Sequence, residues 1–115
     1  MRETLHKLRA AFSRDRSLWP IHAKYWNQLD RWDRPDGELL AGEQHLVFRA
    51  TVPTRIPFVE VPFRAIQKLT SARVWGFVPA VRIETSEETY LFTLLRRAGP
   101  VVEAIRRRQY STPQD

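Results

Sequence analysis

The residue types that most often perform catalysis or hold metals are sparse in this chain. It contains no cysteine, and its three histidines, His6, His22 and His45, fall on three different expected elements. No His-x-x-x-His pair, carboxylate-rich loop or Gly-x-Ser-x-Gly turn is present, so neither a metal site nor an activated nucleophile is predicted. The four glycines stand singly, which argues against a phosphate-cradling loop. The sequence therefore predicts a protein that is not an enzyme, with no cofactor, no metal and no small-molecule substrate.

Basic side chains are the abundant chemical groups, and their distribution along the chain is uneven. Residues 1–34 carry eight Lys or Arg against four Asp or Glu, residues 35–95 carry six against seven, and residues 96–115 carry five against two. The net charges are +4, −1 and +3, which sum to the +6 of the whole chain. A protein that grips nucleic acid through its sheet is expected to concentrate basic residues there. Here the middle is nearly neutral and the two ends are basic.

The N-terminal segment has the pattern of a basic amphipathic helix. Apolar residues recur along it at helical spacing, and Pro20 ends the pattern. Such helices can lie on anionic membrane surfaces. The alternative, which the narrow apolar stripe favours, is that the helix packs on the rest of the domain. In the membrane interpretation the contact residues are Arg2, Arg9, Phe12, Arg14, Arg16 and Trp19, with Arg49 and Arg55 adding charge from a later loop.

The C-terminal arginines support a different hypothesis, in which the protein binds nucleic acid. Four tryptophans in a short chain would suit stacking on bases, although large aromatic side chains more often fill cores and interfaces. A solvated helix end also carries such an arginine run, so nucleic-acid binding stays the alternative. Its candidate contacts are Arg96, Arg97, Arg106, Arg107 and Arg108.

The middle of the chain has the pattern of short strands joined by turns. Gly37 to Ala50 contains two apolar runs around a Gly-containing connection, which predicts a β-hairpin with strands over 38–41 and 45–50. A first strand is expected over 23–30. Apolar and polar residues alternate through the next strand, around residues 59–63. Because Pro62 has no N–H to donate, this strand is expected at a sheet edge or with a break.

Three further strands and a helix are expected downstream. The pattern predicts a strand over 72–77, a turn at Val78-Pro79, and a strand around residues 81–84. A polar turn over 86–88 precedes a last strand over 90–95, which is apolar on both faces. The period then becomes helical, with Ala98, Val101, Val102 and Ile105 on one face. Gly99 at the N-cap and Pro100 at the first helical position form the start signal.

Seven short strands followed by one amphipathic helix resemble the pleckstrin-homology superfold. In that fold antiparallel strands form a barrel of two orthogonal sheets, and a C-terminal helix covers one open end. The motifs are similar to those of its GRAM branch, and the resemblance covers roughly residues 23–108. They are Gly37-Glu38-Leu39 with Leu46-Val47-Phe48, Val61-Pro62-Phe63-Arg64-Ala65-Ile66, and Thr89-Tyr90-Leu91-Phe92.

This resemblance implies a non-catalytic domain that binds phospholipid headgroups or protein segments. Headgroup sites of the superfold draw Lys and Arg from the loop after the first strand. Here that loop contains Asp33 and Asp36, which would repel a phosphate. We therefore expect a protein partner or an anionic membrane surface as the ligand. The protein would dock at the edge strand with Pro62 or beside the C-terminal helix, and the same edge could pair two copies into a homodimer.

The expected organisation is one domain with short extensions. Residues 1–20 form the amphipathic extension, 21–110 the pleckstrin/GRAM-like domain, and 111–115 a disordered tail. No apolar run approaches the roughly 18 residues that span a bilayer, and the N-terminus lacks a secretory signal. We expect a cytoplasmic protein, peripheral at the inner face of the membrane if it binds lipid.

Overall fold

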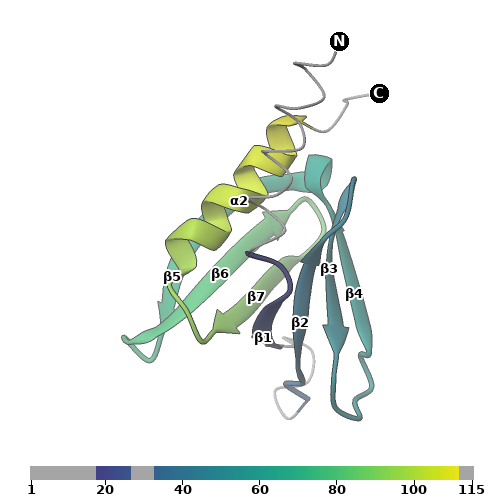
Figure 1. The fold of residues 1–115 in the computed structure, drawn as a ribbon, viewed down its shortest axis with the longest axis vertical. Coiled ribbons are helices and arrows are strands. Elements are labelled where there is room, and N and C mark those ends of the chain that lie inside the picture. The colour runs from purple at the N-terminus through teal and green to yellow at the C-terminus, as the bar shows by residue number, and fades with distance from the viewer. Residues whose placement is uncertain (1–17, 27–32, 112–115) are drawn as a thin grey trace.

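The computed structural model describes residues 18–26 and 33–111, and it shows a β-sheet with a C-terminal helix (Figure 1). The predicted helix over residues 1–20 therefore lies outside the described residues, apart from its last three positions. The elements are β1 (Ile21–Tyr25), β2 (Asp36–Ala41), β3 (His45–Ala50), β4 (Phe58–Pro62), the 3-10 turn η1 (Phe63–Ala65), β5 (Ile66–Val74), β6 (Val78–Thr85), β7 (Thr89–Leu94) and α2 (Ala98–Ser111). No helix among the described residues is long and apolar enough to cross a membrane.

All seven strands belong to one antiparallel sheet. Its order is β4-β3-β2-β1-β7-β6-β5, so β1 lies in the middle and β4 and β5 are the two edges. Ala23 illustrates the central position of β1, because it pairs with Gly37 on one side and with Leu94 on the other. The sequence-based expectation of about seven antiparallel strands and a C-terminal helix is confirmed. The two edge strands are not paired with each other, so the sheet is not closed.

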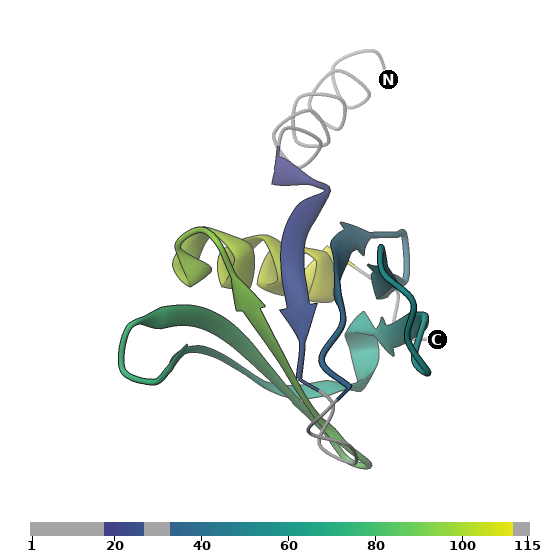
Figure 2. The ribbon, with the colours of Figure 1, turned by 90° about the horizontal axis from the view of Figure 1, so that it is seen from below.

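The core lies on the face of the sheet that α2 covers. Strand residues alternate between this face and the outside, as the pattern Ile21, Ala23, Tyr25 shows: all three are buried, whereas His22 is exposed. Rings from β1, β3 and β7 meet at its centre, with ring centroids 5.3–5.8 Å apart for Tyr25, Phe48 and Phe92. The helix adds Val101, Ala104 and Ile105, which are fully buried. It packs on β5, β6 and η1, and both views show it lying across these strands (Figures 1 and 2).

Several predicted boundaries are wrong, each for a local reason. The first strand begins at Ile21 rather than Ala23, because alternation starts directly after Pro20. The turn predicted at Val78-Pro79 lies instead at residues 75–77, where two successive residues take a positive φ. Pro79 is tolerated within β6 because β6 pairs only with β5 at this position. The pairing of β6 with β7 begins at the next residue, Ala80.

The helix also begins earlier than the sequence indicated. Gly99 was expected at the N-cap, but α2 starts at Ala98, so Gly99 and Pro100 both lie in its first turn. The expected behaviour of Pro62 is confirmed. Pro62 is the last residue of the edge strand β4, and the 3-10 turn η1 separates β4 from β5.

Candidate functional site

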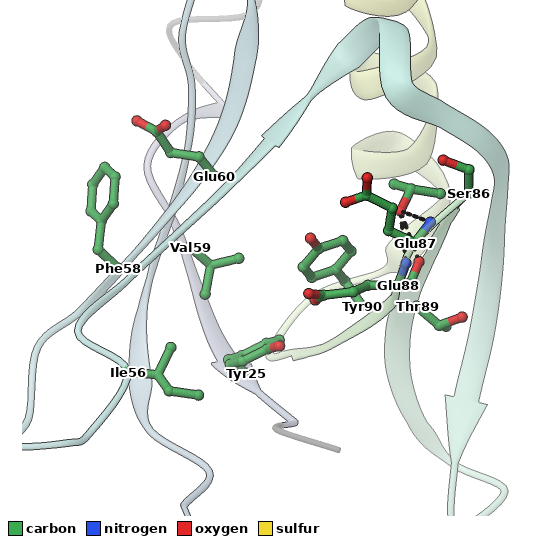
Figure 3. Close-up of a pocket in the computed structure, with 11 residues that line it drawn as sticks. Tyr25, Ile56, Phe58, Val59, Glu60, Ser86, Glu87, Glu88, Thr89 and Tyr90 are labelled. Atoms are coloured by element: carbon green, nitrogen blue, oxygen red, sulfur yellow. Dashed lines mark hydrogen bonds between the residues drawn. The ribbon is translucent and has the colours of Figure 1, made fainter. Parts of the chain in front are cut away.

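A broad cavity of about 820 Å³ lies between the start of β4 and the turn that joins β6 to β7. We call it the tyrosine groove, because the rings of Tyr25 and Tyr90 form one wall. Figure 3 shows Val59 and Ile56 facing these rings across the opening, with Glu87 and Glu88 beside Tyr90.

Among the described residues, the charged side chains that line the tyrosine groove are all of one sign. Glu60, Glu87 and Glu88 are among its lining residues, and none of the described residues that line it is Lys or Arg. The chain as a whole carries a net charge of +6, so this concentration of carboxylates differs from the average surface. The groove therefore offers an electrostatic environment that favours a positively charged ligand.

Both tyrosine hydroxyls hold their protons more tightly than usual. Burial is the main cause of the raised pKa of Tyr25, and the charge of Glu88 adds to it. Burial is also the main cause of the raised pKa of Tyr90, followed by the charge of Glu88 and a hydrogen bond with that carboxylate. At neutral pH both side chains are therefore uncharged phenols, which present hydrogen-bonding hydroxyls and aromatic faces.

The β6–β7 turn places the two glutamates at the rim of the groove. Thr85 organises the turn, because its Oγ1 accepts hydrogen bonds from the N–H groups of Glu87 (3.3 Å) and Glu88 (3.0 Å). The backbone N–H of Thr85 donates in turn to the carbonyl oxygen of Glu88 at 2.9 Å. A turn fixed in this way presents both carboxylates to one side without ordering a long loop.

The opposite side of the groove is the open edge of β4. At one end of the β3–β4 ladder the N–H of Ala50 donates to the carbonyl of Pro57 (2.9 Å), and at the other end the N–H of Phe63, the residue after Pro62, donates to the carbonyl of Gln44 (3.0 Å). In an antiparallel pair, hydrogen-bonded and non-hydrogen-bonded residue pairs alternate. It follows that the backbone groups of Val59 point toward β3, whereas those of Phe58 and Glu60 point away from the sheet. The Phe58 side chain is 51% exposed on this edge.

The residues predicted to contact a membrane are only partly described. Arg2, Arg9, Phe12, Arg14 and Arg16 lie outside the described residues. Trp19 is half-buried and packs against the core.

The two later arginines do not join a common anion site. The Arg49 guanidinium donates to Glu38 across the β2–β3 pair at 3.0 Å. Arg55 is exposed in the loop that leads to β4. Arg49 is therefore already paired with a carboxylate. The loop that carries Arg55 lies beside the acidic tyrosine groove rather than beside a basic pocket.

The five arginines of the nucleic-acid hypothesis fall into two separate groups. Arg96 and Arg97 are exposed just before α2, whereas the other three lie in its last turns. At 1.5 Å per helical residue the two groups are roughly 14 Å apart. Arg106 contacts Glu103 at 3.4 Å, and Arg108 donates to the carbonyl of Gly42 at 3.4 Å. The structure thus places the two groups at opposite ends of α2.

Sequence reasoning missed the tyrosine groove as a site. It took Glu87 and Glu88 as a solvated turn and assigned no role to Tyr25 or Tyr90. The two tyrosines are 65 positions apart (90 minus 25), and only the pairing of β1 with β7 brings them together. One sequence feature did point to this site. The segment with Pro62 was expected to be an edge strand, and that strand forms the other wall of the tyrosine groove.

No protein-family model and no curated protein matches this chain. Among the solved structures that match is the crystal structure of the C-terminal domain of an unknown protein from Leishmania infantum. It is 14% identical in sequence, with a TM-score of 0.66, and the match covers 94% of this chain and 99% of that one. This similarity shows that the architecture of a single sheet with a C-terminal helix occurs in an experimental structure, and at this identity it shows the fold alone.

Proposed function

We propose that this protein is a non-catalytic interaction module that captures an extended segment of a protein partner along β4. The observation that carries this proposal is the open edge of β4 beside the tyrosine groove. A strand that adds to an open edge gains affinity from main-chain hydrogen bonds and specificity from pockets for its side chains. The number and direction of the strands, with the C-terminal helix, support a distant pleckstrin/GRAM-type module as the finer assignment.

The chemistry of the groove specifies the partner segment further. A Lys or Arg side chain entering it would lie near Glu87 and Glu88 and over the ring of Tyr90. Carboxylates pair with such cations, and aromatic faces attract them. The partner is therefore an extended, basic peptide segment of another protein.

The experiment is a selection from a library of random peptides, followed by mapping of the selected peptides by NMR. We expect selected peptides to carry Lys or Arg and to shift the amide signals of β4 and the β6–β7 turn. Selection of no peptide, or shifts that map to the helix side of β5, would overturn the proposal.

A substitution at Glu60 tests the backbone part of the binding mode. Because the N–H of Glu60 points away from β3, Glu60→Pro removes an outward donor and leaves the β3–β4 ladder intact. Losing one hydrogen bond should weaken a selected peptide roughly five- to tenfold. The matched control Glu60→Gln keeps the N–H and removes only the charge, so it separates main-chain pairing from charge attraction.

The homodimer variant of this proposal has its own measurement. If two copies pair through β4, sedimentation equilibrium will give a dimer mass, and Glu60→Pro will lower it. A monomer mass for the wild-type chain at all concentrations removes the homodimer and leaves a different protein as the partner.

A further inference from the structure

The turn between β5 and β6 is apolar and largely exposed to solvent. It consists of Trp75-Gly76-Phe77, where turns usually carry polar residues. Trp75 is 71% exposed and Phe77 is 74% exposed. Leu95, just after β7, is 84% exposed and lines the same small cavity of about 230 Å³ as Trp75. Three large apolar side chains are thus gathered at one end of the sheet.

The backbone of this turn is unusual for the residue that it carries. Trp75 has a φ of +55°, a left-handed conformation that is rare for bulky side chains, and Gly76 follows with a φ of +80°. Asn or Gly at position 75 would adopt this conformation at a lower cost. A tryptophan here is thus poorly suited to forming the turn and well suited to presenting an indole at its apex.

The indole of Trp75 is held in place from the outer face of the sheet. Its ring contacts that of Trp26 edge to face, with centroids 5.5 Å apart. Trp26 is fixed in turn, because its Nε1–H donates to the Thr93 hydroxyl at 2.9 Å and the Arg34 guanidinium stacks 3.8 Å above its ring. The exposed apolar end is therefore preorganised before any ligand arrives.

Three arginines flank these apolar residues in the sequence. Arg73 lies two residues before Trp75, and Arg96 and Arg97 follow Leu95 directly. All three side chains are exposed. Both views place the β5–β6 turn, the end of β7 and the start of α2 at the same end of the molecule (Figures 1 and 2). We call the six residues Arg73, Trp75, Phe77, Leu95, Arg96 and Arg97 the tip surface.

We propose that the tip surface seats this protein on an anionic lipid bilayer. Aromatic rings with a polar edge prefer the interface between headgroups and acyl chains, and arginines around them attract the negative lipid surface. The exposed aliphatic Leu95 suits acyl chains and offers nothing to a nucleic-acid base. This function goes beyond the capture of a peptide, because it uses different residues at a different place in the fold. It also differs from the predicted contact through residues 1–20.

The experiment is co-sedimentation of the full chain with vesicles. One set contains phosphatidylcholine alone and the other contains phosphatidylcholine mixed with phosphatidylglycerol. We expect binding to the anionic set, and weaker binding by roughly tenfold or more for the double variant Trp75→Asn with Phe77→Ser. Asn adopts a positive φ readily, so the turn is retained, and a thermal unfolding curve checks the fold.

A matched control exists on the far end of α2. Tyr110 is an equally exposed aromatic residue, 82% accessible, and Tyr110→Ser should bind vesicles as the wild type does. The charge contribution is tested by Arg96→Gln with Arg97→Gln. At about 1 kcal/mol for each base, this variant should bind anionic vesicles about 30-fold more weakly.

Five outcomes would overturn the proposal. The wild-type chain fails to sediment with anionic vesicles, or the Trp75/Phe77 variant binds them as well as the wild type does. Loss of binding only in Arg14→Glu with Arg16→Glu would assign the contact to the N-terminal segment. A lipid-free dimer that becomes monomeric in the Trp75/Phe77 variant would assign the tip surface to a second copy. Tight binding of a DNA duplex, with no vesicle binding, would assign the arginines to nucleic acid.

Discussion

Replacing Gly37 with alanine should destabilise this domain, because the position has no room for a side chain. Gly37 is buried in β2 and is paired on both sides, with Ala23 of β1 and Ala50 of β3. A Cβ atom at this position would meet the ring of Phe48 at 2.6 and 2.7 Å and the carbonyl oxygen of Arg49 more closely still. The close approach of Phe48 to the bare backbone is what requires glycine here.

The expected loss of stability in Gly37→Ala follows from the distances between the added Cβ atom and its neighbours. Ordinary contact begins near 3.4 Å, so the ring would have to withdraw by roughly 0.8 Å (3.4 minus 2.6). Phe48 is enclosed by Tyr25 and Phe92, and the carbonyl belongs to the paired strand, so neither can move alone. Overpacking costs about 1–3 kcal/mol, and contacts this short place Gly37→Ala in the upper part of that range. The lower flexibility of the unfolded alanine chain offsets about 0.5 kcal/mol of this cost. We expect a net loss of about 2 kcal/mol.

The assay is urea unfolding followed by tryptophan fluorescence, with thermal unfolding as a second measure. A loss of about 2 kcal/mol in a domain of this size corresponds to a Tm lower by about 8 °C. Gly99→Ala is the matched control, because a Cβ there meets nothing within 4 Å. Since Gly99 lies within α2, alanine should raise the free energy of unfolding by a few tenths to about 1 kcal/mol.

Two results would refute this reasoning. If Gly37→Ala unfolds within about 0.5 kcal/mol of the wild type, the strand pair is looser than the contacts imply. If Gly99→Ala lowers the stability, Gly99 is an N-cap residue after all, and the helix begins where the sequence indicated.

Three further predictions concern the groove, the outer face and the helix. Because the pKa values of Tyr25 and Tyr90 are raised in the folded state, their contribution to stability is fully present below the ordinary pKa near 10 and is lost as the pH rises through the folded values. Urea unfolding from about pH 8 to about pH 12 should show this loss, and it should be smaller in Tyr25→Phe. Thr93→Val removes the acceptor of the Trp26 Nε1–H and should cost about 1 kcal/mol in the same assay, whereas a neutral result would show that water replaces the hydroxyl. Ile105→Ala empties a fully buried position under α2 and should cost about 2–5 kcal/mol; a smaller loss in calorimetry would mean that the helix contributes little to the core.

The sequence was sufficient to predict those elements whose pattern depends on neighbouring residues in the chain. The hairpin of β2 and β3 was predicted from its apolar runs, and its second strand has the predicted bounds. The edge position of β4 followed from Pro62, since a missing N–H is a property of one residue. The helix followed from a change of period. In each case the determining interaction lies within a few residues of the signal.

The misplaced turn shows why other features could not be predicted. Trp75 and Phe77 are strong strand formers, so propensity placed them inside a strand, whereas the positive φ values at Trp75 and Gly76 turn the chain there. Nothing local indicates that Trp26, 49 positions earlier, packs against the side of this turn. The tyrosine groove escaped for the same reason, because it depends on strands that meet only in the finished sheet.

The central position of β1 has a consequence for how the chain reaches its structure during synthesis. β1 emerges first among the described strands; β2 can then pair with β1, β3 with β2, and β4 with β3 as each is made. Its second edge stays open until β7 has been made, because Ala23 pairs with Leu94, 71 positions later (94 minus 23). Until then an unpaired edge and an uncovered apolar face are displayed to other chains. A nascent chain that stalls before β7 should therefore depend on chaperones, and completion of the last fifth of the protein should release it.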